Sequence, residues 1–255
     1  GSNPSATTTE QPGGLIVNLT IPAPAPGANG IGIDKATVSR YTRSILPVLR
    51  QVGESTLGWP EPPKRGEGKS IAQARQEHSD LFAFVDATEQ PVRRSSNSET
   101  QKDHYSGKKK RHTRKVQIVT NEHGEIRAVS TSVPGSVHDR TLFTQSGTAE
   151  KIPKDVVTGG DSGYQGIQDD LPDHSVITPF KKSKHHPLSE EQQALNQEFS
   201  RSRIIIENTI GHLKIFKALS ERYRHSVERY DDTFHSVVAI VNPRIQMRVA
   251  LAFAA

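Results

Sequence analysis

Two short apolar runs, each followed by an aspartate, constrain the fold of this chain most strongly. Leu81–Val85 is followed directly by Asp86, and a second run that begins at Val156 leads to Asp161. Apolar runs of this length, bounded by turn residues, indicate strands buried in a sheet. A charge directly after a buried strand lies at its carboxyl end, where open α/β sheets bind ligands. The pattern therefore predicts two aspartates at a ligand-binding edge, with an ordinary turn or cap as the alternative for each.

A third acidic residue, Glu207, lies in a helical pattern that spans residues 201–214. Arg203 precedes it by four residues and Lys214 follows it by seven, so all three share one helix face. Two strand-end carboxylates and one helix carboxylate suit a two-metal site for phosphoryl transfer, because Mg²⁺ prefers oxygen ligands. The alternative for Glu207 is a solvated ion pair with Arg203. Three further acids lie in contexts that we interpret as solvated, namely Glu89, Asp169 and Asp170.

The remaining patterns predict the rest of that sheet and the helices around it. Asn121–Gly124 joins two predicted strands as a hairpin, with Gly124 at the position that favours a positive φ. Ser136 and Asp139 predict a capping box at the start of a short helix, and Pro243 is expected to end the last helix. The order of elements predicts a mixed α/β sheet with helices packed on it. The predicted strands are 81–85, 116–120, 126–130, 156–158 and 176–180, and the predicted helices are 136–144, 189–219 and 230–241.

The first residues of the chain differ in composition from the rest. Residues 1–32 are rich in Pro, Gly, Ser and Thr, and we predict a flexible tail there. Within this tail the apolar stretch Leu15–Ile21 either adds a strand or stays mobile. Residues 57–70 are predicted to be a Pro/Gly linker, with Trp59 as its packing anchor.

An amphipathic basic helix is predicted between the tail and the linker, over residues 36–46. Asp34 is suited to be its N-cap. Pro47 is expected to end this helix or to start a further turn at residues 48–52.

The charge of the chain favours a polyanionic partner. Its 255 residues carry a formal net charge of +5 and include eleven histidines. One run places six cations within residues 108–115, directly before a predicted strand, and a second basic stretch spans residues 181–186. Such runs are typical of an edge that contacts phosphates, with solvated charge or a targeting signal as alternatives. The candidates for DNA contact in these runs are Lys108, Lys109, Lys110, Arg111, Arg114, Lys181 and Lys182.

Two classes of protein and site are excluded by composition. The chain has no cysteine, so disulfides and thiolate metal sites are impossible. No apolar run approaches the ~20 residues that span a bilayer, and no signal peptide is visible. We therefore expect no association with a membrane.

Five motifs, taken together and in this order, resemble the DDE transposases of bacterial insertion sequences, which are related to Harbinger-type elements. They are Asp86-Ala-Thr-Glu, Tyr105–Thr113, Pro134–Asp139, Gly160–Gly166 and Arg203-x₃-Glu207-x₆-Lys214. The resemblance covers about residues 34–245. It implies a ribonuclease-H-like fold, a mixed sheet flanked by helices. It also implies that three residues are catalytic and bind Mg²⁺, with Mn²⁺ able to substitute, namely Asp86, Asp161 and Glu207.

Two departures from this family affect the interpretation. The family's Tyr–Arg–Glu–Lys signature is matched except at its tyrosine, where this chain has Ser200. The family also has a complete helix-turn-helix, whereas here residues 33–56 resemble only its recognition helix, with Arg40 and Arg43 as DNA-contacting candidates. We therefore interpret the chain as a truncated or degenerated copy. A partial helix-turn-helix segment at 33–56 precedes a catalytic domain at 71–255.

The resemblance implies a transposase that nicks DNA at the ends of its element and joins the released 3′-hydroxyl to target DNA. Arg203 and Lys214 are then expected to position phosphates or to orient Glu207. The alternative is a catalytically silent DNA-binding protein derived from such an element. The expected partners are double-stranded DNA, as transposon ends and target, and a second copy in a homodimeric active complex. The expected location is the cytoplasm at a bacterial nucleoid, or the nucleus of a eukaryote.

Overall fold

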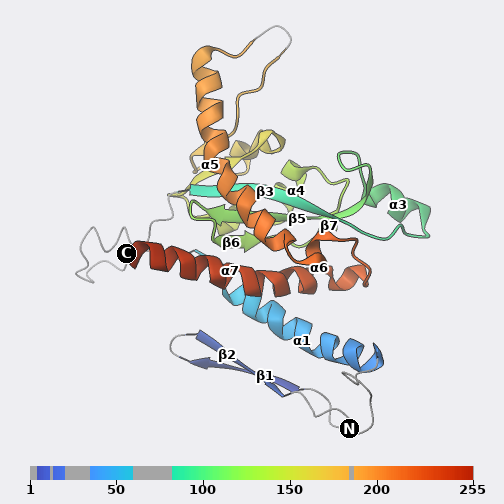
Figure 1. Ribbon diagram of the computed structural model, residues 1–255. Helices are drawn as coiled ribbons and strands as arrows, with labels where there is room; N and C mark the ends of the chain where they lie inside the picture. Colours follow the sequence, from blue (N-terminus) through green and yellow to red (C-terminus); the bar gives the residue numbers. More distant parts are fainter. Residues whose placement is uncertain (1–4, 12–13, 21–34, 60–81, 184–186, 255) are drawn as a thin grey trace.

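A mixed β-sheet is the centre of the molecule (Figure 1). The computed structural model describes residues 5–11, 14–20, 35–59, 82–183 and 187–254. The main sheet has the strand order β4-β5-β3-β8-β9, and β6 and β7 also pair with β5. The strands are β3 (Phe82–Pro91), β4 (Tyr105–Ser106), β5 (Arg111–Asn121), β6 (Ile126–Val129), β7 (Val133–Pro134), β8 (Val157–Gly160) and β9 (Val176–Ile177).

The central strand β3 has an antiparallel neighbour on one side and a parallel neighbour on the other. It pairs with β5 from Ala83 to Pro91, and with β8 only from Phe82 to Val85. The prediction that this strand ends at Val85 is therefore wrong, because β5 offers hydrogen-bonding partners along its whole length. The parallel ladder does end at Val85. The predicted hairpin is confirmed, with Gly124 at a φ of 82°.

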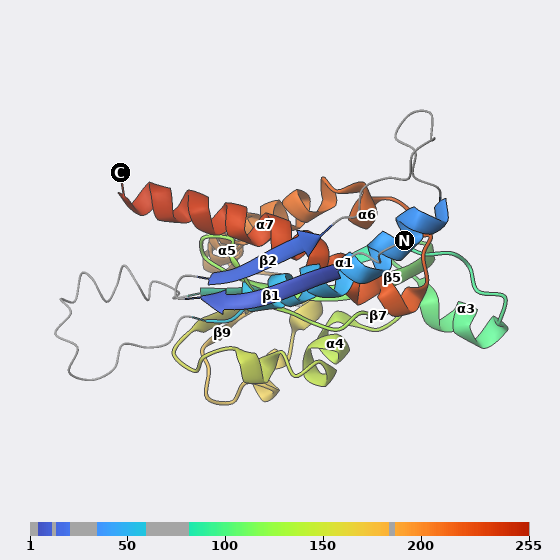
Figure 2. The ribbon, with the colours of Figure 1, turned by 90° about the horizontal axis from the view of Figure 1, so that it is seen from below.

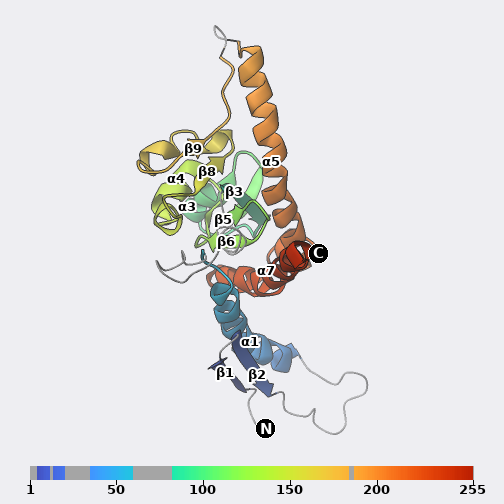
Figure 3. The same cartoon turned by 90° about the vertical axis from the view of Figure 1, so that its left-hand side faces the viewer.

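Helices cover both faces of the sheet, and the views along it separate the two layers (Figure 3). One face packs on α5 (Glu190–Lys214), α6 (Lys217–Ser220) and α7 (Tyr230–Ala254). The other packs on α4 (Asp139–Gln145) and the 3₁₀ helices Ala149–Lys151, Ser162–Tyr164 and Ile167–Asp169. Side chains alternate between the faces, so Ile118 of β5 joins the first core and Val119 the second. The predicted mixed sheet flanked by helices is confirmed, and it agrees with a ribonuclease-H-like fold.

The start of α4 differs from the prediction. His138, not Ser136, is the N-cap, and its side chain accepts a hydrogen bond from the Arg140 backbone N–H. Asp139 is free of the capping role because its carboxylate pairs with the Lys115 ammonium at 2.6 Å. The buried charge partner on β5 therefore decides what Asp139 does, and the local capping pattern does not.

The two C-terminal helices also differ from the predicted bounds. The long helix ends at Lys214, and α6 follows as a separate short helix from Lys217. By contrast α7 continues through Pro243 to Ala254. Val241 and Ile245, on either side of that proline, are both buried in the same core. Packing on both sides outweighs the cost of about 3 kcal/mol that proline imposes inside a helix.

The N-terminal part contains a hairpin and one long helix (Figure 2). β1 (Ser5–Gln11) and β2 (Gly14–Thr20) pair antiparallel, within the predicted tail. Helix α1 (Lys35–Ser55) runs through Pro47, where either the end of the helix or the start of a further turn was predicted. It packs along α7, and its Arg50 lies 2.9 Å from the Asp232 carboxylate. This tertiary contact explains why the helix is longer than local sequence suggests.

The segment after α1 is tied to the sheet. The Gly58 backbone N–H donates to the Arg127 carbonyl at 2.8 Å. Trp59 packs against the second core, as predicted for an anchor. Asp34, the predicted N-cap, lies outside the described residues, as does most of the predicted linker. The division into tail, partial helix-turn-helix, linker and catalytic domain stays a prediction. The described residues also form helix α3 (Ser98–His104) and the 3₁₀ helix Val227–Arg229 before α7.

None of the helices in the described part of the chain combines the length and the apolar character needed to cross a bilayer.

Candidate catalytic site

Asp86 and Asp161 lie next to each other on adjacent strands. The parallel register pairs Val85 of β3 with Gly160 of β8, and each aspartate is the next residue. Adjacent strands are about 4.8 Å apart, so the two carboxylates leave the sheet as neighbours. Asp161 follows the end of β8, as predicted, whereas Asp86 lies in the middle of β3 at the point where the parallel ladder stops.

Asp86 is a buried carboxylate with few compensating charges. Its side chain is 20% exposed, accepts a hydrogen bond from the Ala87 N–H at 2.7 Å, and lies 3.4 Å from the Arg203 guanidinium. The pKa of Asp86 is raised to about 6, mainly by burial and to a smaller extent by the nearby carboxylates of Asp161 and Asp139, against the opposing effects of the Ala87 N–H and Arg203. The charged form of Asp86 is therefore disfavoured at this position, mainly because the carboxylate is removed from water.

Asp139 and Asp161 face the same glycine. The Asp161 carboxylate accepts a hydrogen bond from the Gly163 N–H at 2.8 Å. A Cβ built on Gly163 would lie 3.0 Å from Oδ1 of Asp161 and 3.1 Å from Oδ2 of Asp139. Any larger residue would therefore push into both carboxylates. Below them Tyr164 is buried, and burial together with these acids raises its pKa well above the usual range.

Glu207 shares a cavity with Asp86. This cavity has a volume of about 180 Å³ and lies between β3, α5, the start of α4 and the turn that joins β4 to β5. It is lined by Asp86, Ala87, Thr88, Glu89, Lys108, Lys109, Asp139, Glu207, Ile210 and Lys214. Arg203, Glu207 and Lys214 lie on one face of α5, as predicted, and this face is directed at β3. The Arg203 guanidinium contacts Asp86, and the Lys214 ammonium lies 3.4 Å from the Glu89 carbonyl. Across the residues that the structure describes, however, no three acidic or histidine side chains are close enough to share a metal ion.

The predicted basic residues occupy three different environments. Lys108 and Lys109 line the acidic cavity, and Lys110, at a φ of 54°, makes the turn into β5. Arg111 begins β5, so part of the run is strand, not the approach to one. Arg114 does not face outward as a phosphate contact would, since its guanidinium donates to the carbonyl and hydroxyl of Ser132, each at 2.7 Å.

The other predicted DNA contacts lie away from the cavity. Lys181 and Lys182 are exposed on the segment between β9 and α5, and neither lines the cavity. Arg40 and Arg43 are exposed on α1. The paired histidines at 185–186 fall outside the described residues.

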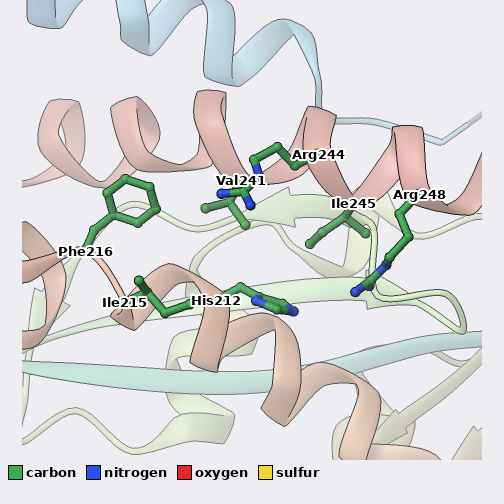
Figure 4. A pocket seen from close by; sticks show the side chains of 7 residues that line it. All are labelled: His212, Ile215, Phe216, Val241, Arg244, Ile245 and Arg248. Carbon is green, nitrogen blue, oxygen red and sulfur yellow. The ribbon is translucent and has the colours of Figure 1, made fainter.

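A second cavity, of about 190 Å³, lies between α5 and α7 (Figure 4). His212 of α5 and Ile215, the residue that follows α5, face Arg244 and Arg248 of α7 across it. None of its seven described lining residues is a carboxylate, so it is no candidate for a metal site.

Comparison with known proteins identifies the family to which this geometry belongs. Residues 85–242 match the family described as DDE superfamily endonuclease. The chain belongs to this superfamily. It is also 34% identical over 218 residues to the probable transposase for insertion sequence element IS702 from Microchaete diplosiphon. That match covers 85% of this chain and 73% of the relative, and it supports a DDE transposase of insertion sequences. No solved structure matches the chain significantly.

Two residues at the candidate site were not identified from the sequence, Glu89 and Lys115. Glu89 was interpreted as solvated, but its side chain is 5% exposed, and it accepts a hydrogen bond from the Thr113 hydroxyl at 2.7 Å. Lys115 is opposite Glu89 in the β3–β5 register, and its ammonium lies 3.8 Å from that carboxylate and 2.6 Å from Asp139. Opposite charges in such cross-strand positions stabilise a sheet. A correct prediction of the antiparallel register between β3 and β5 would have placed these two residues opposite each other.

Proposed function

We propose that this transposase cuts DNA at the ends of its element and transfers the released 3′-hydroxyl to target DNA, with a divalent metal held by Asp86, Asp161 and Glu207. The observation that carries the proposal is the pair of neighbouring aspartates, with burial and like charge raising the pKa of Asp86. A cation bound beside Asp86 would stabilise the charged form of this carboxylate, which burial disfavours. The printed description of the relative, a probable transposase, supports the reaction class.

The donor set fits a hard divalent cation. The candidate ligands are carboxylate oxygens, and Mg²⁺ prefers oxygen donors, usually one or two carboxylates with water and substrate phosphate. A bound ion would activate water and neutralise charge on the transferred phosphate. Arg203, which lies beside Asp86 at 3.4 Å, supplies part of the compensating charge in the absence of the ion.

The lysines around the cavity would hold the DNA backbone. Lys214 is half-buried, and both burial and the charge of Lys109 lower its pKa. The ammonium groups of Lys109 and Lys214 repel each other across the cavity, and a phosphate bound between them would offset this repulsion. The ion pair with Lys115 would fix the orientation of the Asp139 side chain beside Asp161. These residues bind and orient the substrate strand next to the acidic pair.

The test is nicking of supercoiled plasmid in the presence of Mg²⁺. Asp86→Asn, Asp161→Asn and Glu207→Gln should each abolish nicking while leaving binding to a duplex within about twofold. The control is Asp169→Asn, which removes an acid whose side chain is 77% exposed, and it should nick normally. Wild-type levels of nicking in any of the three variants would contradict the assignment of that residue.

The second candidate is a DNA-binding protein without catalytic activity. One observation favours it, namely that the three acids do not lie within a shared ligand distance among the described residues. The same assay separates the candidates, because a silent protein would bind duplex DNA and never nick it with Mg²⁺ or Mn²⁺. The homodimeric active complex and the location at the host's DNA stay predictions.

A further inference from the structure

We propose that a groove between α1 and the segment before α7 binds the phosphate backbone of duplex DNA, at a site separate from the catalytic cavity. The inference rests on the proposed function in that DNA is the substrate. The groove has a volume of about 480 Å³. Thr42 and Leu46 of α1 form one wall, and the cationic side chains of Lys217, Arg222, Arg224 and Arg229 contribute to the other. We call this site the α1 groove.

The α1 groove carries positive charge that the protein leaves uncompensated. Its described lining has one carboxylate, Glu221, which lies 3.9 Å from the ammonium of Lys217. Within the described part of the chain, no carboxylate comes within 4.0 Å of the guanidinium of Arg222, Arg224 or Arg229. Arginines bind phosphate well because their planar donors match two phosphate oxygens at once. Three such unneutralised groups in one groove favour a polyanion.

Hydrogen bonds to β3 and its end fix the backbone beside Arg222 and Arg224. Tyr223 is 4% exposed, and its N–H donates to the Pro91 carbonyl at 2.8 Å. Gln90 donates to the carbonyls of Ala218 and Glu221, each at 2.8 Å. In extended backbone successive side chains point to opposite faces. With Tyr223 directed inward, its two neighbouring arginines face outward, and their rigid base lowers the entropy lost on binding.

Helix α1, which carries the opposite wall, is held against α7 at its C-terminal end. Near the C-terminus of α1, a Cβ on Gly53 would lie 2.3 Å from the His235 carbonyl oxygen, so the two helices touch there. The Asn242 side chain also donates to the Thr56 carbonyl at 2.9 Å. Arg40 and Arg43 are exposed on α1, beside the groove residue Thr42. Neither arginine lines the α1 groove, to which α1 contributes Thr42 and Leu46.

The position of the α1 groove favours a long polyanion over a small one. Lys214 lines the catalytic cavity, and Lys217, three residues later, lines the groove. Val92 directly follows β3 and is six residues from Asp86, which in extended backbone is roughly 20 Å. Val92 pairs with the groove residue Tyr223. A duplex rises about 3.4 Å per base pair. One duplex with a phosphate at Asp86 would therefore reach the groove about six base pairs away.

The experiment is a salt titration of duplex binding by the full chain. The triple variant Arg222→Gln, Arg224→Gln, Arg229→Gln should lower the slope of log affinity against log salt by up to about 2.7, from about 0.9 per lost phosphate contact. The matched control removes three exposed lysines elsewhere, by Lys102→Gln, Lys151→Gln and Lys154→Gln, and should change the slope by less than about 0.5. Fluorescence anisotropy with a labelled 30-base-pair duplex gives both slopes. Equal changes in the two triple variants would overturn the proposal.

Further arms distinguish a duplex-DNA groove from a misfolded variant, a small-anion site and an RNA site. The charge-conserving variant Arg222→Lys, Arg224→Lys, Arg229→Lys should restore most of the slope, and a failure to do so would assign the loss to misfolding and overturn the proposal. Loss of the difference between variants in 10 mM inorganic phosphate would show a small-anion site instead. A larger loss on duplex RNA than on duplex DNA would indicate RNA as the partner. Plasmid nicking that survives with unchanged duplex binding would refute the groove and leave the catalytic proposal standing.

Discussion

Replacing the carboxylate of Asp86 with an amide should stabilise the folded protein at neutral pH in metal-free buffer. Burial raises the pKa of Asp86 from its ordinary value of 3.8 to about 6. One pH unit of displacement corresponds to about 1.4 kcal/mol, so the buried charge costs at most about 3 kcal/mol. The side chain is 20% exposed, and the real figure should be about 1–3 kcal/mol.

The sign of the effect follows from proton linkage. Between pH 4 and pH 6 the folded state binds the proton more tightly than the unfolded state, so wild-type stability falls as pH rises through this window. Asp86→Asn has no such charge, and its oxygen can still accept the hydrogen bond from Ala87. The advantage of the variant should therefore be near zero at pH 4, grow up to about pH 6, and stay constant above it.

Urea unfolding at pH 4 and pH 7.5, with EDTA present, measures this difference. Asp169→Asn is the control, since its side chain is 77% exposed and surface ion pairs contribute little to stability. An advantage of Asp86→Asn that is equal at both pH values, or a loss of stability at pH 7.5, would show that the buried Asp86 charge does not destabilise the folded protein.

Four other predictions follow from the structure. Replacing Lys108–Arg111 with alanine should weaken binding to any duplex about equally and lower the salt slope by roughly 0.9 per lost contact, whereas an unchanged slope would assign the run to solvent or targeting. Competition between the element's terminal repeat and scrambled duplex should give a preference far below the ~10³ of dedicated readers, because a recognition helix needs a bracing helix across the backbone; a preference above about a hundredfold would contradict this. Gly53→Ala should destabilise the protein by about 1–3 kcal/mol, because its Cβ would lie 2.3 Å from a backbone oxygen of α7. Gly211→Ala has open space around it and should stabilise the protein by up to about 1 kcal/mol. Equal shifts of the two variants in urea unfolding would count against the contact between α1 and α7. Lys115→Met should cost about 3–5 kcal/mol by leaving two buried carboxylates unpaired, against almost nothing for the exposed Lys154→Met, and comparable melting curves would contradict it.

Local patterns were sufficient to find the acidic pair and the class of fold. Asp86 and Asp161 each follow an apolar run, and the parallel register then brings them together. The hairpin at Gly124 was equally local, because a positive φ leaves few choices of residue. These features depend on neighbours in sequence, which is why the sequence alone indicates them.

Features that depend on distant partners could not be predicted in this way. Pro47 and Pro243 break helices by local rules, yet packing between α1 and α7 and within the core keeps both helices continuous. Glu89 was interpreted as solvated because its opposite residue, Lys115, is 26 positions away and becomes its neighbour only through the strand register. Asp139 does not take part in the predicted capping box, because its carboxylate forms an ion pair with the same lysine. Each error has the same origin, a tertiary contact that overrides a local preference.

The central claim is that Asp86, Asp161 and Glu207 hold divalent ions. The most direct measurement is the anomalous difference density of a crystal of the chain soaked in Mn²⁺. We expect one or two peaks bound by all three carboxylates, at metal–oxygen distances of roughly 2.0–2.6 Å, with the Arg203 guanidinium displaced from Asp86. Peaks that are absent from this site, or that lie on other residues, would contradict the account.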